Sequence, residues 1–235
     1  MSRKEIEEYI VHRLTDKLAK HVFFLSKASY KTERYASFEL KKDEAIYQWT
    51  IIFKKYGNIE VFLTIYYESI SKLYKQLSKQ INEEANFVFS VKMNTYLHPK
   101  NADGYHNTSD YLESPYRQEI SGGNNLDKVV EGVFQTYFLD CVPKLIDQTD
   151  TLEKANDLIN SIPIKYKENG KPQMLVFSTS FVIQILNGIL IAQAIKTPKY
   201  EEIKKEYLKY AEKFATGEVP AIDLLREAIE KFNPN

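Results

Sequence analysis

The chain has 235 residues, 43% of them hydrophobic, so it is long enough to bury one substantial core or two small ones. Its 32 basic residues balance its 32 acidic residues, which argues against a nucleic-acid binder, because such proteins usually carry a basic excess. A single cysteine, Cys141, excludes an internal disulfide framework and a cysteine-rich zinc site, and its apolar neighbours predict a buried structural thiol.

The N-terminus begins with a helix-capping motif. Ser2 and Glu5 have the Ser-x-x-Glu spacing in which each side chain bonds the other residue's backbone N–H. Apolar residues then recur at helical spacing as far as Leu18, which predicts a helix over residues 3–20. No apolar leader is visible, and the most hydrophobic stretch, 181–195, is too short and too polar to span a bilayer. We therefore expect a soluble, cytoplasmic protein that does not enter a membrane.

Residues 35–67 form three strand-length runs rich in β-branched and aromatic residues, separated by two polar breaks. They predict an antiparallel meander. Its second turn pairs Trp49 with Leu63, and its first turn pairs Trp49 with Phe38. In this register one face of the sheet is apolar and must be covered by helices. This predicted core face comprises Ala36, Phe38, Leu40, Tyr47, Trp49, Ile51, Phe53, Ile59, Val61, Leu63 and Ile65.

The opposite face of the meander, called the second face below, mixes aromatic with polar side chains. It is too polar for a dry core and too aromatic for an ordinary solvent-exposed surface. Aromatic residues are enriched at recognition surfaces, so this face is the candidate binding surface. The candidate binding residues on it are Tyr35, Gln48, Glu60, Phe62 and Tyr66.

The remaining chain completes an α+β pattern. After a short helical stripe, alternating apolar residues over 87–93 predict a fourth strand. Residues 98–125 are irregular, and residues 126–235 are helical, with Pro143 expected to bend or end their first helix. We predict a single α+β domain. It consists of a helix-plus-sheet part at 1–97, with an N-terminal helix and an antiparallel meander of about four strands, and a C-terminal helical half packed on the sheet.

Three segments in the second half are similar to a known group of proteins. They read Phe138-Leu-Asp-Cys-Val-Pro-Lys-Leu145, Asp150-Thr-Leu-Glu-Lys154 and Ile189-Leu-Ile-Ala-Gln-Ala-Ile-Lys-Thr-Pro-Lys-Tyr-Glu-Glu-Ile203. With the helix and meander before them, they resemble small uncharacterised bacterial α+β proteins that are defined as a domain of unknown function. Some members of that group look like immunity-type proteins encoded near polymorphic toxins. The resemblance covers most of the chain and supplies no catalytic residues.

The irregular loop suggests one catalytic alternative. His98 and His106 lie there with Asp103 and Asp110 nearby, which would suit a hydrolytic or metal site. No tight metal-ligand spacing is present, however, and loops commonly collect His and Asp.

A second catalytic alternative comes from Glu39-x-Lys41, which has the form of half of a metal-dependent nuclease site. In such a site the carboxylate holds Mg²⁺ and the lysine stabilises the attacking water or the phosphate. The predicted register argues against it, because Glu39 sits beside Gln48 and Thr64 in a row with no second carboxylate, and Glu60 lies two strands and two rows away.

We therefore expect a non-catalytic module, immunity-type or regulatory, that binds a protein partner and no nucleic acid, and that needs no cofactor or metal. A metal-dependent hydrolase or nuclease is the alternative hypothesis. Self-association through the same sheet is a third.

Overall fold

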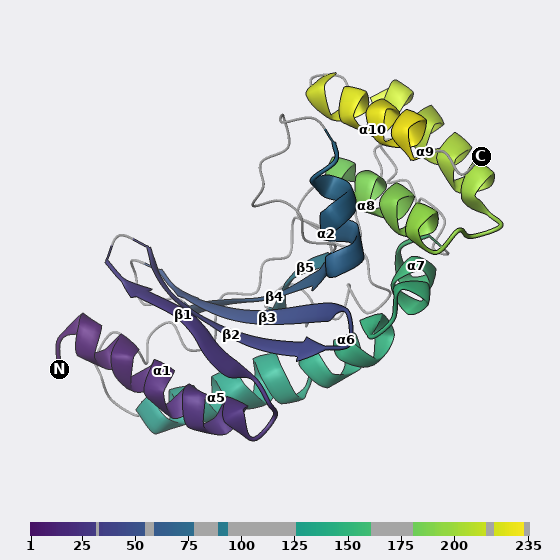
Figure 1. Ribbon diagram of the computed structural model, residues 1–235. Helices are drawn as coiled ribbons and strands as arrows, with labels where there is room; N and C mark the ends of the chain where they lie inside the picture. The colour runs from purple at the N-terminus through teal and green to yellow at the C-terminus, as the bar shows by residue number, and fades with distance from the viewer. Residues whose placement is uncertain are drawn as a thin grey trace, which may run out of the picture.

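The computed structural model describes residues 1–31, 33–54, 59–77, 89–93, 126–160, 181–214 and 219–232. These ranges form the predicted α+β fold: an N-terminal helix, an antiparallel sheet, and a mostly helical second half (Figure 1). The predicted loop at 98–125, with His98 and His106, lies outside the described residues.

The first half contains α1 (Arg3–Ala19), β1 (Phe24–Tyr30), β2 (Arg34–Lys42), β3 (Ala45–Phe53), β4 (Ile59–Tyr67), α2 (Glu68–Tyr74) and β5 (Phe89–Lys92). The second half contains α5 (Leu126–Phe134), the π-helix η3 (Gln135–Leu139), α6 (Val142–Thr149), α7 (Leu152–Asn160), α8 (Phe181–Ala194), α9 (Tyr200–Phe214) and α10 (Val219–Lys231). The predicted capping box is present at the start of α1.

The five strands pair in sequence order, each antiparallel to the next. The predicted register is confirmed, with Trp49 opposite both Phe38 and Leu63. The sequence predicted about four strands, and the strand it missed is β1. Most residues of β1 are exposed, so its sequence lacks the apolar alternation that marks a half-buried strand. A bulge between Leu25 and Lys27 interrupts its pairing with β2.

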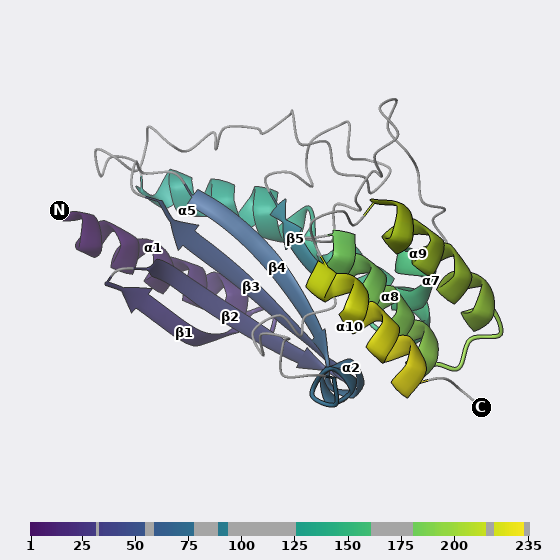
Figure 2. The same cartoon turned by 90° about the horizontal axis from the view of Figure 1, so that it is seen from above.

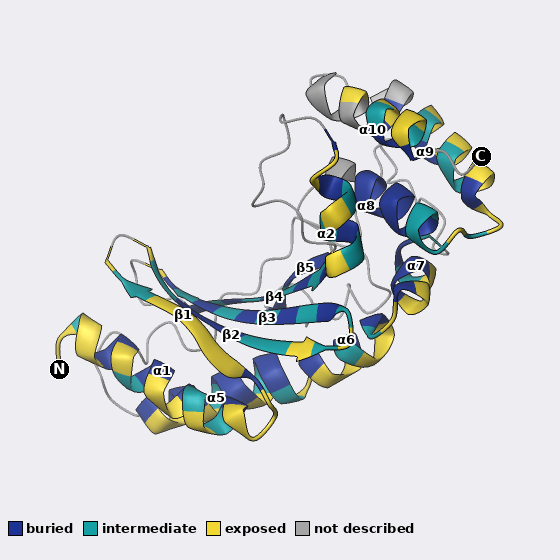
Figure 3. Ribbon diagram, in the orientation of Figure 1, coloured by how far each residue is buried: buried dark blue, intermediate teal, exposed yellow. Residues whose placement is uncertain are grey.

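The predicted core face is buried except for Leu40, which is partly buried. Helices α1, α5 and α6 lie against this side of the sheet (Figures 1 and 3). The ring of Trp49 meets the ring of Phe138 edge to face, with centroids 6.0 Å apart. Its indole N–H donates to the carbonyl of Tyr137 at 3.2 Å, so the one polar atom of this buried side chain is satisfied.

The first helix of the second half is divided more finely than the sequence indicated. The chain passes from α5 through the wider turn of η3, and α6 then begins with Pro143 in its first turn. Pro143 therefore starts a helix rather than ending one, because the first turn is where proline's missing N–H costs nothing. Cys141, between η3 and α6, is buried as expected, and burial raises the pKa of its thiol to about 12.

Helix α8 organises the C-terminal helices. It packs against α2, α7, α9 and α10, and these helices stand beside one end of the sheet (Figures 1 and 2). The hydroxyl of Tyr74 in α2 donates to the side-chain oxygen of Asn187 in α8, inside the protein. None of the helices described here is long and apolar enough to cross a membrane.

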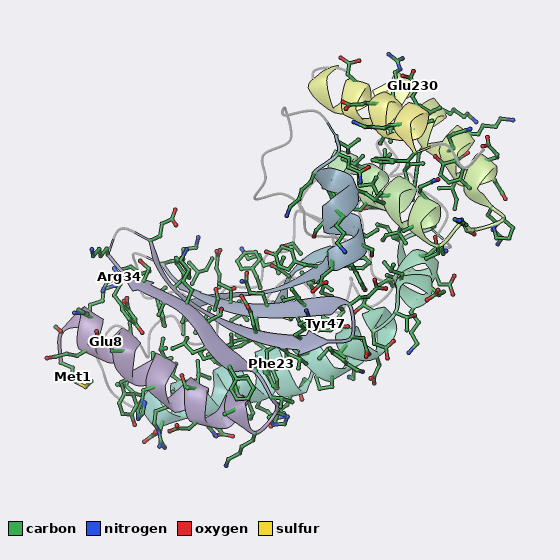
Figure 4. All side chains as sticks on the ribbon, in the orientation of Figure 1. Met1, Glu8, Phe23, Arg34, Tyr47 and Glu230 are labelled. Carbon is green, nitrogen blue, oxygen red and sulfur yellow. The ribbon has the colours of Figure 1, made fainter. Side chains whose placement is uncertain are left out.

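A buried carboxylate ties α1 to the sheet. Glu7 is 1% exposed and accepts from Arg3 Nε at 2.9 Å and from Arg34 Nε at 2.7 Å. Figure 4 shows Arg34 at the end of the sheet nearest the start of α1. Arg3 also donates to the carbonyl of Lys54 at 2.7 Å. One anion thus holds two cations, which join helix α1 to strands β2 and β3.

Replacing Glu7 with Gln should lower the free energy of unfolding by about 2 kcal/mol, because two arginines lose their charged acceptor while part of their surface stays hydrated. Urea denaturation followed by circular dichroism measures the change. The matched control is Glu8→Gln, which removes an exposed carboxylate 3.5 Å from Lys4 and should change stability by less than about 0.5 kcal/mol. Equal effects of the two variants would contradict this role for Glu7.

Gly188 in α8 allows close contact with α7 and α9. A Cβ at this position would lie 2.6 Å from Asn160 Oδ1 and 2.7 Å from Tyr207 Cε2. Glycine to alanine inside a helix ordinarily adds about 1 kcal/mol of stability. Here we expect Gly188→Ala to destabilise the fold by about 1–3 kcal/mol, since two packed side chains must move. A thermal or urea unfolding curve showing a more stable variant would refute this packing.

Candidate binding face

The second face of the sheet is not covered by any helix among the residues described. Figure 2 views the sheet from this side, with α1 and α5 behind the strands and α8, α9 and α10 beside one end. Along β3 and β4, buried residues of the core face alternate with partly exposed residues of the second face. The side chains of the second face from β2 to β4 are Tyr35, Ser37, Glu39, Lys41, Ile46, Gln48, Thr50, Ile52, Glu60, Phe62, Thr64 and Tyr66.

All five predicted binding residues lie on this face and are half-buried. Tyr35 and Glu60 share one row, with Ile52 between them. Phe62 lies in the next row and Gln48 in the one after it, while Tyr66 is opposite Ile46 near the end of the sheet. The register therefore spreads the predicted residues over the whole face.

Hydrogen bonds between side chains order the middle of the face. Gln48 Nε2 donates to Glu39 Oε1 at 2.8 Å, and the hydroxyls of Ser37 and Thr50 are 2.9 Å apart. Burial raises the pKa of Tyr66, and the nearby charge of Glu39 raises it further. Polar side chains are thus held in fixed positions between the aromatic ones.

Two lysines bind Glu60 at one edge of the face. Its carboxylate lies 2.6 Å from Lys92 Nζ and 2.9 Å from Lys54 Nζ. Burial tends to raise the pKa of Glu60, but the hydrogen bonds and charges of the two lysines outweigh it, so the pKa lies below its ordinary value. The same Lys92 ammonium lies 5.9 Å from the centre of the Phe62 ring, within the range of a cation–π contact.

The catalytic candidates Glu39 and Lys41 are not arranged as a metal site. Glu39 bonds Gln48, and Lys41 bonds Glu68 at the start of α2. As predicted, Glu60 is two strands and two rows from Glu39. Within the described ranges, no group of three His, Cys, Asp or Glu residues could hold a metal ion. The hydrolase or nuclease alternative stays a hypothesis, because His98 and His106 lie outside those ranges.

The sequence reasoning missed Phe24, which extends the second face. Phe24 lies on β1 directly opposite Glu39, and opposite residues of an antiparallel pair share a face. It is 59% exposed, whereas most large apolar side chains in the described ranges are buried or partly buried. The available signal was the apolar run Val22–Leu25 directly after the first helix, which reads as a possible strand start.

Comparison with protein-family models, curated proteins and solved structures found no match for this chain. The resemblance to immunity-type proteins therefore stays a hypothesis.

The two ion pairs of Glu60 lead to a prediction about the titration of its carboxyl group. Replacing Lys92 with Met should raise the pKa of the Glu60 carboxyl toward its ordinary value, because the closer of its two cations is lost. Ionised Glu60 stabilises the fold fully above its ordinary pKa, and this stability is lost as the pH falls through the lowered folded pKa. In the variant this contribution should be smaller, and its loss should be complete at a higher pH.

Carboxyl chemical shifts followed from pH 2 to 7 by NMR give the Glu60 pKa in both proteins. Lys20→Met, which removes an exposed lysine after α1, is the control and should leave the titration unchanged. An unchanged Glu60 titration in Lys92→Met would show that Lys92 does not set this pKa.

Proposed function

We propose that this protein is a non-catalytic module that binds a protein partner through the second face of its sheet. The observation that carries the proposal is the partial exposure of Tyr35, Phe62 and Tyr66 on a face that none of the described helices covers. Aromatic side chains of this kind supply much of the binding energy at protein interfaces.

The face is also ordered before any partner arrives. Its side chains project from paired strands, and Lys27 and Lys92 lie over the rings of Tyr35 and Phe62 at 5.7 and 5.9 Å. Side chains that are already fixed lose less conformational entropy on binding, so more of the contact energy appears as affinity. An ordered, mixed aromatic and polar face therefore suits specific recognition.

We further propose an immunity-type or regulatory role. The support is the resemblance of three segments in the second half to a group with immunity-like members, together with the binding face. A toxin-neutralising protein acts by occupying its partner's surface and needs no catalytic group of its own. Under this proposal the partner is a protein, and neither nucleic acid nor a membrane is involved.

The proposal predicts that changing two aromatic residues weakens partner capture. The double variant Phe62→Ala and Tyr66→Ala should retain its partner from a lysate of the source cells at least tenfold more weakly than the wild-type protein, because each side chain contributes about 1–2 kcal/mol at an interface centre. Quantitative mass spectrometry of the retained proteins measures the ratio.

The control is the double variant His12→Ala and Asp16→Ala, which changes exposed residues of α1 on the other side of the sheet. It should retain the partner like the wild-type protein. Unfolding curves check that both variants are folded. Equal retention by the aromatic variant, or equal loss in the control, would contradict binding through the second face, and light scattering would show whether the captured partner is instead a second copy of the chain.

A further inference from the structure

One corner of the second face combines an exposed aromatic ring with a carboxylate that has no cationic partner in the part of the chain that the structure describes. Phe24 and Glu39 lie directly opposite each other on β1 and β2. The partner that the structure shows for Glu39, among the residues it describes, is the neutral amide of Gln48. By contrast, Glu60 on the same face is bound by two lysines.

Two lysines on the neighbouring positions of β1 and β2 contact other groups. Lys41, two residues along β2, pairs with Glu68 of α2, and Lys27 lies over the ring of Tyr35. Gln48 Nε2 donates to Oε1 of Glu39 and so orients the carboxylate on the face. An ordered anion beside an exposed ring is the combination that attracts a guanidinium, because the flat cation can stack on the ring while its N–H groups bond the carboxylate.

We propose that Phe24 and Glu39 form a docking site for an arginine side chain of the protein partner. This inference rests on the proposed function and deepens it by naming the chemistry that the partner presents. Arginine fits better than lysine, since its planar group bonds and stacks at once. Electrostatic complementarity of this kind fixes the orientation of a complex and rejects partners that present an acid at the same place.

The test uses a small probe on the whole protein. Acetyl-arginine amide is titrated into ¹⁵N-labelled protein, and its uncharged isostere acetyl-citrulline amide is titrated in parallel. The arginine probe should shift the side-chain amide signals of Gln48 and the backbone amide signals of Phe24 and Glu39. The citrulline probe should bind at least about fivefold more weakly than the arginine probe. Raising the salt concentration should weaken the arginine response.

Two variants distinguish binding at this site from non-specific electrostatic attraction of the cationic probe to the protein surface. Glu39→Gln should weaken the arginine response about fivefold. Glu131→Gln, which removes an exposed carboxylate of α5, should leave the response unchanged. Equal shifts by the two probes, or an unchanged response in Glu39→Gln, would overturn the arginine site.

That outcome is distinguishable from failure of the proposed function. If partner capture depends on Phe62 and Tyr66 but not on Glu39 or Phe24, the second face binds a partner and the arginine site is wrong. If capture also falls in Glu39→Gln and Phe24→Ala, the partner uses this corner as inferred.

Discussion

The strict alternation of side chains along β3 and β4 is the constraint on which the rest of the structure depends. Each strand buries every second residue on the core face, and a register shift of one residue would move this apolar set to the other side. The core face must therefore be covered, and α1, α5 and α6 cover it. The hydroxyls of Tyr47 and Tyr67 both donate to the carbonyl of Thr149 at the end of α6, which joins sheet and helices with directional bonds as well as apolar contacts. The second face is left partly exposed because none of the helices in the described ranges lies over it.

Local patterns in the sequence predicted much of this arrangement. The register followed from the spacing of apolar residues around Trp49, and the capping box at Ser2 located the start of α1. Strand β1 was missed because most of its residues are exposed, so neither of its faces requires an apolar alternation. The π-helix η3 was missed because the apolar spacing of an amphipathic helix does not reveal a single turn of π-helical hydrogen bonds. The same reasoning explains the candidate site. The five predicted residues could be placed on the second face from the register of β2, β3 and β4, whereas placing Phe24 there required knowledge of strand β1.

The exposed edge of the sheet is a less suitable binding surface than its second face. The bulge between Leu25 and Lys27 interrupts the regular alternation of side chains along β1. Another strand could therefore not pair along the whole edge of β1 in one continuous register. Lys27 near the middle of β1 adds a charge, and both features are common protections against edge-to-edge association. Under the proposed function, the partner would therefore bind the aromatic and polar rows of the second face.

The central claim, that one face of the sheet is buried while the other is accessible, is tested most directly by hydroxyl-radical footprinting with residue-level mass spectrometry. Tyr35, Phe62 and Tyr66 should be oxidised several times faster than Phe38 and Trp49, which are buried on the core face of the same sheet, in proportion to their accessible surface. Equal protection of the two sets would show that the second face is covered in solution, and it would contradict both the binding face and the function proposed from it.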